Sequence, residues 1–173
     1  MSVLVGLPVD ARPVVRSQVG ALVRCAGWEL RLPEVCALGH LRQPADRDVL
    51  QAWLLNQVRD AQGLVVSLDM LVYGGLVPSR FIADPLPDLL RRLEGVTALR
   101  RAAPNCPILA FAATMRISNN NDAQEEKSYW NEHGSDLWSW SFHTDRARML
   151  GDAQSEELAR SAEARIPQAI RND

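Results

Sequence analysis

The stretch GLVVSLDMLVYGGLVPSR, residues 63–80, carries the clearest strand pattern in the chain and then changes character. Residues 63–68 are almost wholly apolar, as in a central strand of a parallel sheet, whose two faces are both covered. Asp69 interrupts this run, and a tyrosine, a glycine pair and an arginine soon follow. A carboxylate is tolerated in such a strand only where the sheet opens to water or to a partner charge. The stretch therefore predicts a buried strand that ends at a polar site.

Short apolar runs of this kind alternate with segments of helical spacing along the chain. The predicted strands are residues 3–7, 28–32, 63–68 and 107–112. Alternation of strands and helices is typical of right-handed βαβ units and a parallel sheet. We therefore expect one α/β domain over residues 1–173, with at least four parallel strands and flanking helices.

Two closures of this sheet remain open. A complete (β/α)₈ barrel needs about 250 residues, so a chain of 173 residues could form only its N-terminal half. A half-barrel would place the strands in sequential order and leave an exposed edge strand and apolar surface. The alternative is an open doubly wound sheet, in which the first and third strands are neighbours.

Polar residues before several helical segments predict where those helices begin. Asp46 is a candidate N-cap, and Asp84 followed by Pro85 has the pattern of a capping carboxylate with proline in the first turn. Residues 122–125 have the spacing of a capping box, which predicts a helix running towards Gly134. A further helix is expected over residues 153–165.

The composition excludes several classes of protein. The net charge is −2 and the pI is about 5.9, so no basic surface for nucleic acid or for an anionic membrane is expected. The three cysteines have no zinc-site spacing and are expected to be reduced and mostly buried. The start of the chain does not resemble a signal peptide, and no apolar run approaches the ~18 residues of a membrane span. We therefore expect a cytoplasmic protein without metal or cofactor, whose partner is a small molecule.

Polar groups follow three of the predicted strands, at the end where ligands bind in parallel sheets. The candidate catalytic residues are Asp10 and Asp69, and the candidate ligand-binding residues are Arg12, Tyr73, Gly74, Gly75, Arg80, Arg116 and Glu126. Carboxylates can act as acid and base, and guanidinium groups bind anions or hydroxyl groups through forked hydrogen bonds.

Each candidate also has a purely structural interpretation. Asp69 could form a salt bridge with Arg12 or Arg116, and Asp10 could cap the first helix. The glycine pair could simply make a tight turn with positive φ, and the tryptophans of the C-terminal part could pack in a core. The sequence leaves these alternatives open.

Three blocks resemble a bacterial family of uncharacterised proteins, domain-of-unknown-function family 4127. They are LPVDARPV (residues 7–14), SLDMLVYGGLVPSR (residues 67–80) and TMRISNNNDAQEEKSYW (residues 114–130). The opening block of that family has two acidic residues before Arg-Pro, and here Ala11 replaces the second. Family members are considerably longer, so the resemblance implies that this chain is an N-terminal part. It implies no activity.

Two functions fit these patterns. One is a hydrolase, of glycosidic bonds for instance, in which Asp10 and Asp69 are the paired carboxylates. The other is a non-catalytic domain that binds a small anionic or polyhydroxy ligand through the same groups.

Overall fold

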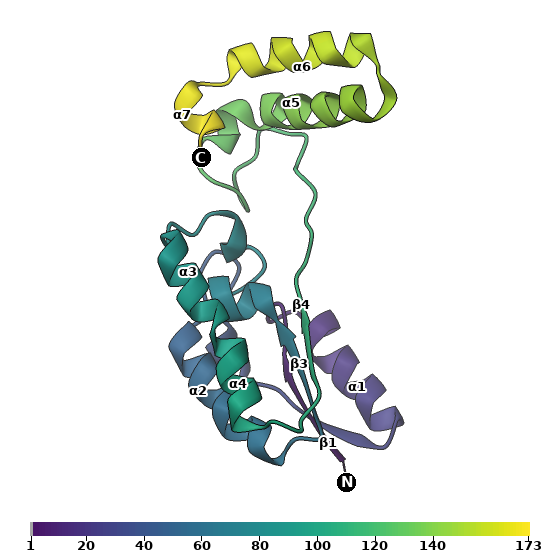
Figure 1. Cartoon of the computed structure of the whole chain (residues 1–173), viewed down its shortest axis with the longest axis vertical. Helices are drawn as coiled ribbons and strands as arrows, with labels where there is room; N and C mark the ends of the chain where they lie inside the picture. Colours follow the sequence, from purple (N-terminus) through teal and green to yellow (C-terminus); the bar gives the residue numbers. More distant parts are fainter. Residues whose placement is uncertain (1) are drawn as a thin grey trace. The chain divides into compact units, whose positions relative to one another are not determined.

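The computed structural model describes residues 2–173, which form two compact units, one up to Ala113 and one from Thr114 to Asp173. Unit 1 contains the sheet and unit 2 is helical (Figure 1). The strands are β1 (Ser2–Leu7), β2 (Trp28–Arg31), β3 (Gly63–Ser67) and β4 (Ile108–Phe111). The α-helices of unit 1 are α1 (Ser17–Cys25), α2 (Arg47–Gln57), α3 (Leu86–Leu93) and α4 (Gly95–Ala102). Its shorter turns are η1 (Pro13–Val15), η2 (Val35–Leu38), η3 (Val58–Asp60), η4 (Asp69–Tyr73) and η5 (Pro78–Arg80). The prediction of a single domain stays a prediction.

All four strands are parallel, and their order in the sheet is β2-β1-β3-β4. This confirms the predicted parallel α/β fold. Because β1 lies between β2 and β3, the strands are not in sequential order, and the half-barrel alternative is wrong. The sheet is open and doubly wound. The chain runs from β1 to β2 on one side, then crosses to β3 on the other side of β1, and continues to β4.

One face of the sheet carries the core of unit 1. Alternate residues of β1 and β3 are almost fully buried on this face, where they contact the inner faces of α2 and α4 (Figure 1). The core residues on these four elements are Val3, Val5, Leu7, Leu50, Leu54, Leu64, Val66 and Leu99. Burying an aliphatic side chain stabilises a fold by about 1.5–3 kcal/mol, so this layer fixes β3 at the centre of the unit.

The other face of the sheet is less covered. Of the four α-helices described in unit 1, α1 alone lies on this side (Figure 1). On β4, which is an edge strand, Leu109 is 63% exposed and Phe111 is 39% exposed. The exposed edge strand and apolar surface expected of a half-barrel are therefore present, but on an open sheet.

The predicted helix starts differ in outcome. Asp46 caps α2, because its carboxylate accepts hydrogen bonds from the backbone N–H groups of Asp48 and Val49 at 3.1 Å. Asp84 does not cap α3: that helix begins at Leu86 without a side-chain cap. The Asp84 carboxylate instead forms an ion pair with Arg47.

Unit 2 is built on a helical hairpin of α5 (Trp130–Leu150) and α6 (Ala153–Arg165), followed by α7 (Gln168–Arg171). The predicted helix over 153–165 is confirmed by α6. The capping-box prediction is wrong, because residues 112–129 form neither helix nor strand and α5 continues through Gly134. A Cβ atom at Gly134 would lie 2.1 Å from the Asn120 carbonyl oxygen, so glycine here allows the preceding loop to lie against the helix. Asn121 fastens that loop by accepting a hydrogen bond from the Ser135 N–H at 2.8 Å.

The cysteines do not follow the expected burial. Cys25 and Cys36 are exposed, and only Cys106 is buried. Cys25 is the last residue of α1, a helix whose apolar residues Val19 and Leu22 are also exposed, and Cys36 lies in η2. Within residues 2–173, no helix combines the length and the apolar character needed to cross a membrane.

Candidate functional site

The carboxyl ends of β1 and β3 form the topological switch point of the sheet, where open α/β sheets bind their ligands. The two strands pair from Leu4 with Gly63 to Leu7 with Val66. Asp10 and Asp69 each lie three residues beyond the last of these pairs. Asp10 and Asp69 therefore each follow the carboxyl end of one of two neighbouring strands.

Asp69 begins a π-helical turn instead of ending the strand. β3 ends at Ser67, whose hydroxyl oxygen accepts a hydrogen bond from the Met70 N–H at 3.3 Å. The turn η4 then runs from Asp69 to Tyr73. Single π-helical turns are rare and occur often at functional sites, because they change the direction of side chains within a short segment. Tyr73 is the last residue of this turn.

The Asp69 side chain is buried and hydrogen-bonded. It is 6% exposed, and its Oδ2 atom accepts a hydrogen bond from the backbone N–H of Ala113 at 2.9 Å. A buried carboxylate needs such a donor, since its transfer from water without a partner costs several kcal/mol. Among residues 2–113 its hydrogen-bond partner is this amide. The structural alternative of a salt bridge with Arg12 stays a prediction.

Asp10 and Arg12 form an ion pair in the segment that follows β1. The Oδ1 atom of Asp10 accepts a hydrogen bond from the Arg12 backbone N–H at 2.9 Å. Its Oδ2 atom accepts from Nε of Arg12 at 2.8 Å and lies 2.6 Å from Nη2. The alternative in which Asp10 caps α1 is wrong, because α1 begins at Ser17 without a side-chain cap. The Arg12 side chain is exposed, so this edge presents a guanidinium group with a fixed orientation.

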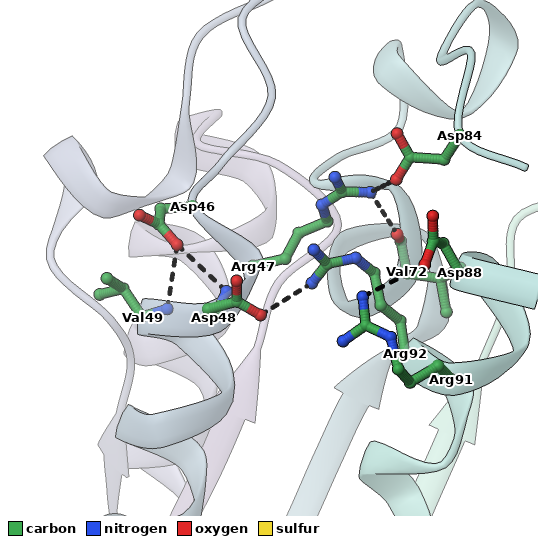
Figure 2. Close-up of polar contacts among 9 residues, drawn as sticks. All are labelled: Asp46, Arg47, Asp48, Val49, Val72, Asp84, Asp88, Arg91 and Arg92. Atoms are coloured by element: carbon green, nitrogen blue, oxygen red, sulfur yellow. Dashed lines mark hydrogen bonds and ion pairs between the residues drawn. The ribbon is translucent and has the colours of Figure 1, made fainter.

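The turn after Asp69 is tied to the rest of unit 1 by polar contacts. Arg47, at the start of α2, donates from Nη1 to the Val72 carbonyl oxygen at 3.0 Å and to Oδ2 of Asp84 at 2.6 Å (Figure 2). The Gly74 carbonyl oxygen accepts from the Ala45 N–H at 2.9 Å. The turn is thus held in place before any ligand arrives, which is what a binding site requires.

The glycine pair has the predicted positive φ angles, 82° at Gly74 and 140° at Gly75. A Cβ atom at Gly74 would lie 2.9 Å from both the Ala45 nitrogen and the Pro44 Cβ. A Cβ at Gly75 would lie 3.3 Å from Cδ of Pro78. The chain itself therefore occupies the space beside Gly74, which gives this residue a structural role.

The remaining candidates are divided between the two units. Tyr73 and Arg80 belong to unit 1, in η4 and η5, and both are partly buried. Arg116 and Glu126 belong to unit 2. Glu126 is buried, and Arg116 lines a cavity of about 680 Å³ with Trp138 and Phe142, whose rings are stacked. The predicted contact between Asp69 and Arg116 stays a prediction.

Two groups that hold the candidate site in place, the Arg47 side chain and the Ala113 N–H, could not be predicted from the sequence. Arg47 looked like an ordinary residue of the first turn of a helix, and the Ala113 N–H has no side chain that could mark it. Asp84 offered a signal, a carboxylate before proline, but the signal pointed to a helix cap. Within residues 2–173 no cluster of three or more His, Cys, Asp or Glu side chains is arranged to hold a metal ion.

Unit 1 is therefore an open, doubly wound α/β fold, with the hydrogen-bonded carboxylate of Asp69 beyond the carboxyl end of β3. The chain belongs to the DUF4127 family, described as proteins of unknown function, whose sequence model matches residues 4–173. This confirms the family to which the sequence blocks were similar. No curated protein and no solved structure matches the chain.

Proposed function

We propose that unit 1 binds a small polyhydroxy or anionic ligand beyond the carboxyl ends of β1 and β3. The observation that carries this proposal is the position of Asp69, which is 6% exposed and lies where open α/β sheets bind their ligands. A group of this kind can accept hydrogen bonds from a ligand in a place from which water is largely excluded, where such bonds are strong.

The side chains around Asp69 have complementary roles in this proposal. The exposed guanidinium group of Arg12 holds an anionic or hydroxyl group of the ligand, and Asp10 keeps that guanidinium in one orientation. The further groups of unit 1 proposed to contact the ligand are Tyr73, Gly74, Gly75 and Arg80.

A second candidate is a hydrolase, with glycosidic bonds as the proposed substrates. It is favoured by the two carboxylates at equivalent positions on neighbouring strands. Arg12 donates to both oxygens of Asp10, and in this proposal Asp10 is the base or nucleophile. Asp69 is buried and accepts one hydrogen bond, and in this proposal it is the acid that protonates the leaving-group oxygen.

One screen tests both functions. The purified protein is incubated with a panel of nitrophenyl glycosides and nitrophenyl phosphate, while turnover and the melting temperature are measured. A rise in melting temperature without turnover supports the binding domain, and release of nitrophenol supports the hydrolase. Asp69→Asn should abolish either effect, whereas Asp88→Asn, at an exposed carboxylate on α3, should preserve it. Absence of both effects across the panel in the unaltered protein contradicts the proposal.

We further propose that the protein works in the cytoplasm without a nucleic-acid partner. A net charge of −2 with mixed charges along the chain supports this, since binding to a phosphate backbone needs a basic surface. Salt-dependent binding to DNA or RNA near physiological ionic strength, measured by fluorescence anisotropy, would contradict it.

A further inference from the structure

Beyond the last residue pair of β3 and β4, the Asp69 side chain replaces a backbone carbonyl as the acceptor of a hydrogen bond from the chain that follows β4. The two strands pair in register from Leu64 with Ile108 to Ser67 with Phe111. Continued by two residues, this register would place residue 69 opposite residue 113, but β3 has already turned into η4. The Asp69 carboxylate makes the hydrogen bond to the Ala113 N–H instead. The Asp69 side chain thus holds the segment that follows β4 in place beyond the end of the strand pair.

Ala113 has a special position in the chain. It is the last residue of unit 1, and the segment of residues 112–129 that leads into α5 contains neither helix nor strand. β4 is also the edge of the described sheet, so β3 is its single strand neighbour there. The hydrogen bond that Ala113 donates to Asp69 therefore holds the chain where it leaves the sheet.

The same carboxylate lies at the centre of the candidate site. One of its oxygens, Oδ2, is engaged by Ala113, and a carboxylate has further lone pairs with which to accept hydrogen bonds from a ligand. A donor bound there would fix the carboxylate in its present orientation. The Ala113 hydrogen bond would then open less often, since the side chain could no longer rotate away from it.

We propose that the Asp69–Ala113 hydrogen bond couples ligand binding at the switch point to the segment that joins the two units. The ligand in this inference rests on the proposed function, whereas the hold of Asp69 on Ala113 does not. Coupling of this kind is reciprocal: if the ligand strengthens the hydrogen bond, then the hydrogen bond strengthens ligand binding by the same factor.

The hold itself is tested with Asp69→Ala and Asp69→Asn in the whole chain. Hydrogen exchange of the Ala113 amide is followed by NMR, and trypsin cleavage after Arg116 gives a second readout. Asp69→Ala removes the acceptor of this hydrogen bond, so it should speed the exchange of Ala113 by about tenfold or more. Asp69→Asn should exchange nearly as slowly as the unaltered protein, because the asparagine oxygen still accepts. Asp88→Ala, on α3, should change nothing. Exchange in Asp69→Ala at the unaltered rate would overturn the inference.

The coupling is tested with a nitrophenyl glycoside that raises the melting temperature. This probe should slow the exchange of Ala113 further in the unaltered protein. Ala113→Pro removes the N–H while Asp69 remains, and should weaken binding of the same probe. Probe binding with unchanged exchange of Ala113 would refute the coupling. A panel without any binder would contradict the proposed function, while the result for Asp69→Ala would still decide whether Asp69 holds the segment.

Discussion

Gly74 shows how a single residue positions the candidate site. It ends the π-helical turn that starts at Asp69, and its φ of 82° lies in the left-handed region that a side chain rarely adopts. The segment of Pro44 and Ala45 lies against it at distances that leave no room for a Cβ atom. The backbone conformation and the close approach both require glycine here. Together they fix the position of the turn against the segment that precedes α2.

Gly74→Ala should therefore destabilise the protein through two separate effects. Gly27 provides the control: its φ is 77°, but among residues 2–173 no atom lies within 4 Å of the position that a Cβ would take. Gly27→Ala should lower the free energy of unfolding by about 1 kcal/mol through backbone strain alone. Gly74→Ala should lower it by about 2–4 kcal/mol, because steric overlap is added to the strain. Equal effects of the two substitutions in urea unfolding would contradict this account of Gly74.

For single residues, the backbone conformation could be predicted from the sequence more accurately than the side-chain contacts. The positive φ of the glycine pair followed from local chemistry and is confirmed. Asp69 is buried, but it is the first residue of η4, two positions beyond the end of β3. The partner of Asp69 was predicted as an arginine because guanidinium groups leave a signal in the sequence. A backbone N–H leaves none, so the hydrogen bond to Ala113 could not have been predicted.

At the scale of elements, Arg47 joins α2 to the turn η4 and to the segment before α3. Its side chain is 15% exposed and that of its partner Asp84 is 26% exposed, so the pair is largely shielded from water (Figure 2). Arg91 and Asp88, shown in the same figure, pair on α3 at 3.4 Å with exposures of 63% and 48%. Shielded pairs that also satisfy a carbonyl oxygen contribute more to stability than exposed ones.

Arg47→Met should lower the free energy of unfolding by about 1–3 kcal/mol, because it leaves the Val72 carbonyl oxygen and the Asp84 carboxylate without their donor. Arg91→Met should change it by less than about 0.5 kcal/mol. Chemical denaturation of both variants measures the difference. Similar values for the two would show that the contacts of Arg47 do not anchor the turn.

Asp173 fastens the segment after α7 to the start of α5. Its carboxylate pairs with Lys127 and accepts a hydrogen bond from the Tyr129 hydroxyl at 2.7 Å. Burial, this hydrogen bond and the charges of Asp173 and Glu126 raise the pKa of Tyr129 to about 12. The protonated phenol is the form that the fold favours. Its contribution to stability is therefore complete below the ordinary pKa of about 10 and is lost as the pH rises through 12.

Spectroscopic titration can check this assignment. In a Tyr73→Phe background, Tyr129 is the one remaining tyrosine, and its ionisation should appear near pH 12 in the ultraviolet spectrum. Asp173→Asn should move the pKa of Tyr129 down towards 10 without reaching it, because burial still disfavours the phenolate. Ionisation near pH 10 in the Tyr73→Phe protein would contradict the hydrogen bond.

Predictions for whole elements succeeded where the signal was local. The apolar runs located the strands to within one or two residues, and the Asp46 cap marked the start of α2. The Asp84 prediction failed because its carboxylate binds Arg47, a residue 37 positions earlier that competes with the helix terminus. The capping-box prediction failed because the preceding loop fastens onto α5 further along, at Ser135.

At the scale of the whole molecule, strand order decided where the site lies. The pattern of alternating elements predicts a parallel sheet, but it is the same for sequential and for doubly wound order. The order depends on which faces of the helices pack together, and those contacts join residues far apart in the chain. Because β1 and β3 are neighbours, Asp10 and Asp69 both follow strands that end at the switch point. The family match over residues 4–173 adds no activity to this geometry.

The claim at the centre of this account is that Asp69 is the group on which a ligand binds. The most direct test is carbon NMR of the Asp69 carboxyl group in the whole chain, titrated with the nitrophenyl glycosides and nitrophenyl phosphate. The account predicts that the Asp69 signal moves with saturation of the bound probe, together with the Ala113 amide, while the signal of Asp88 stays in place. A probe that saturates the protein without moving the Asp69 signal would contradict the claim.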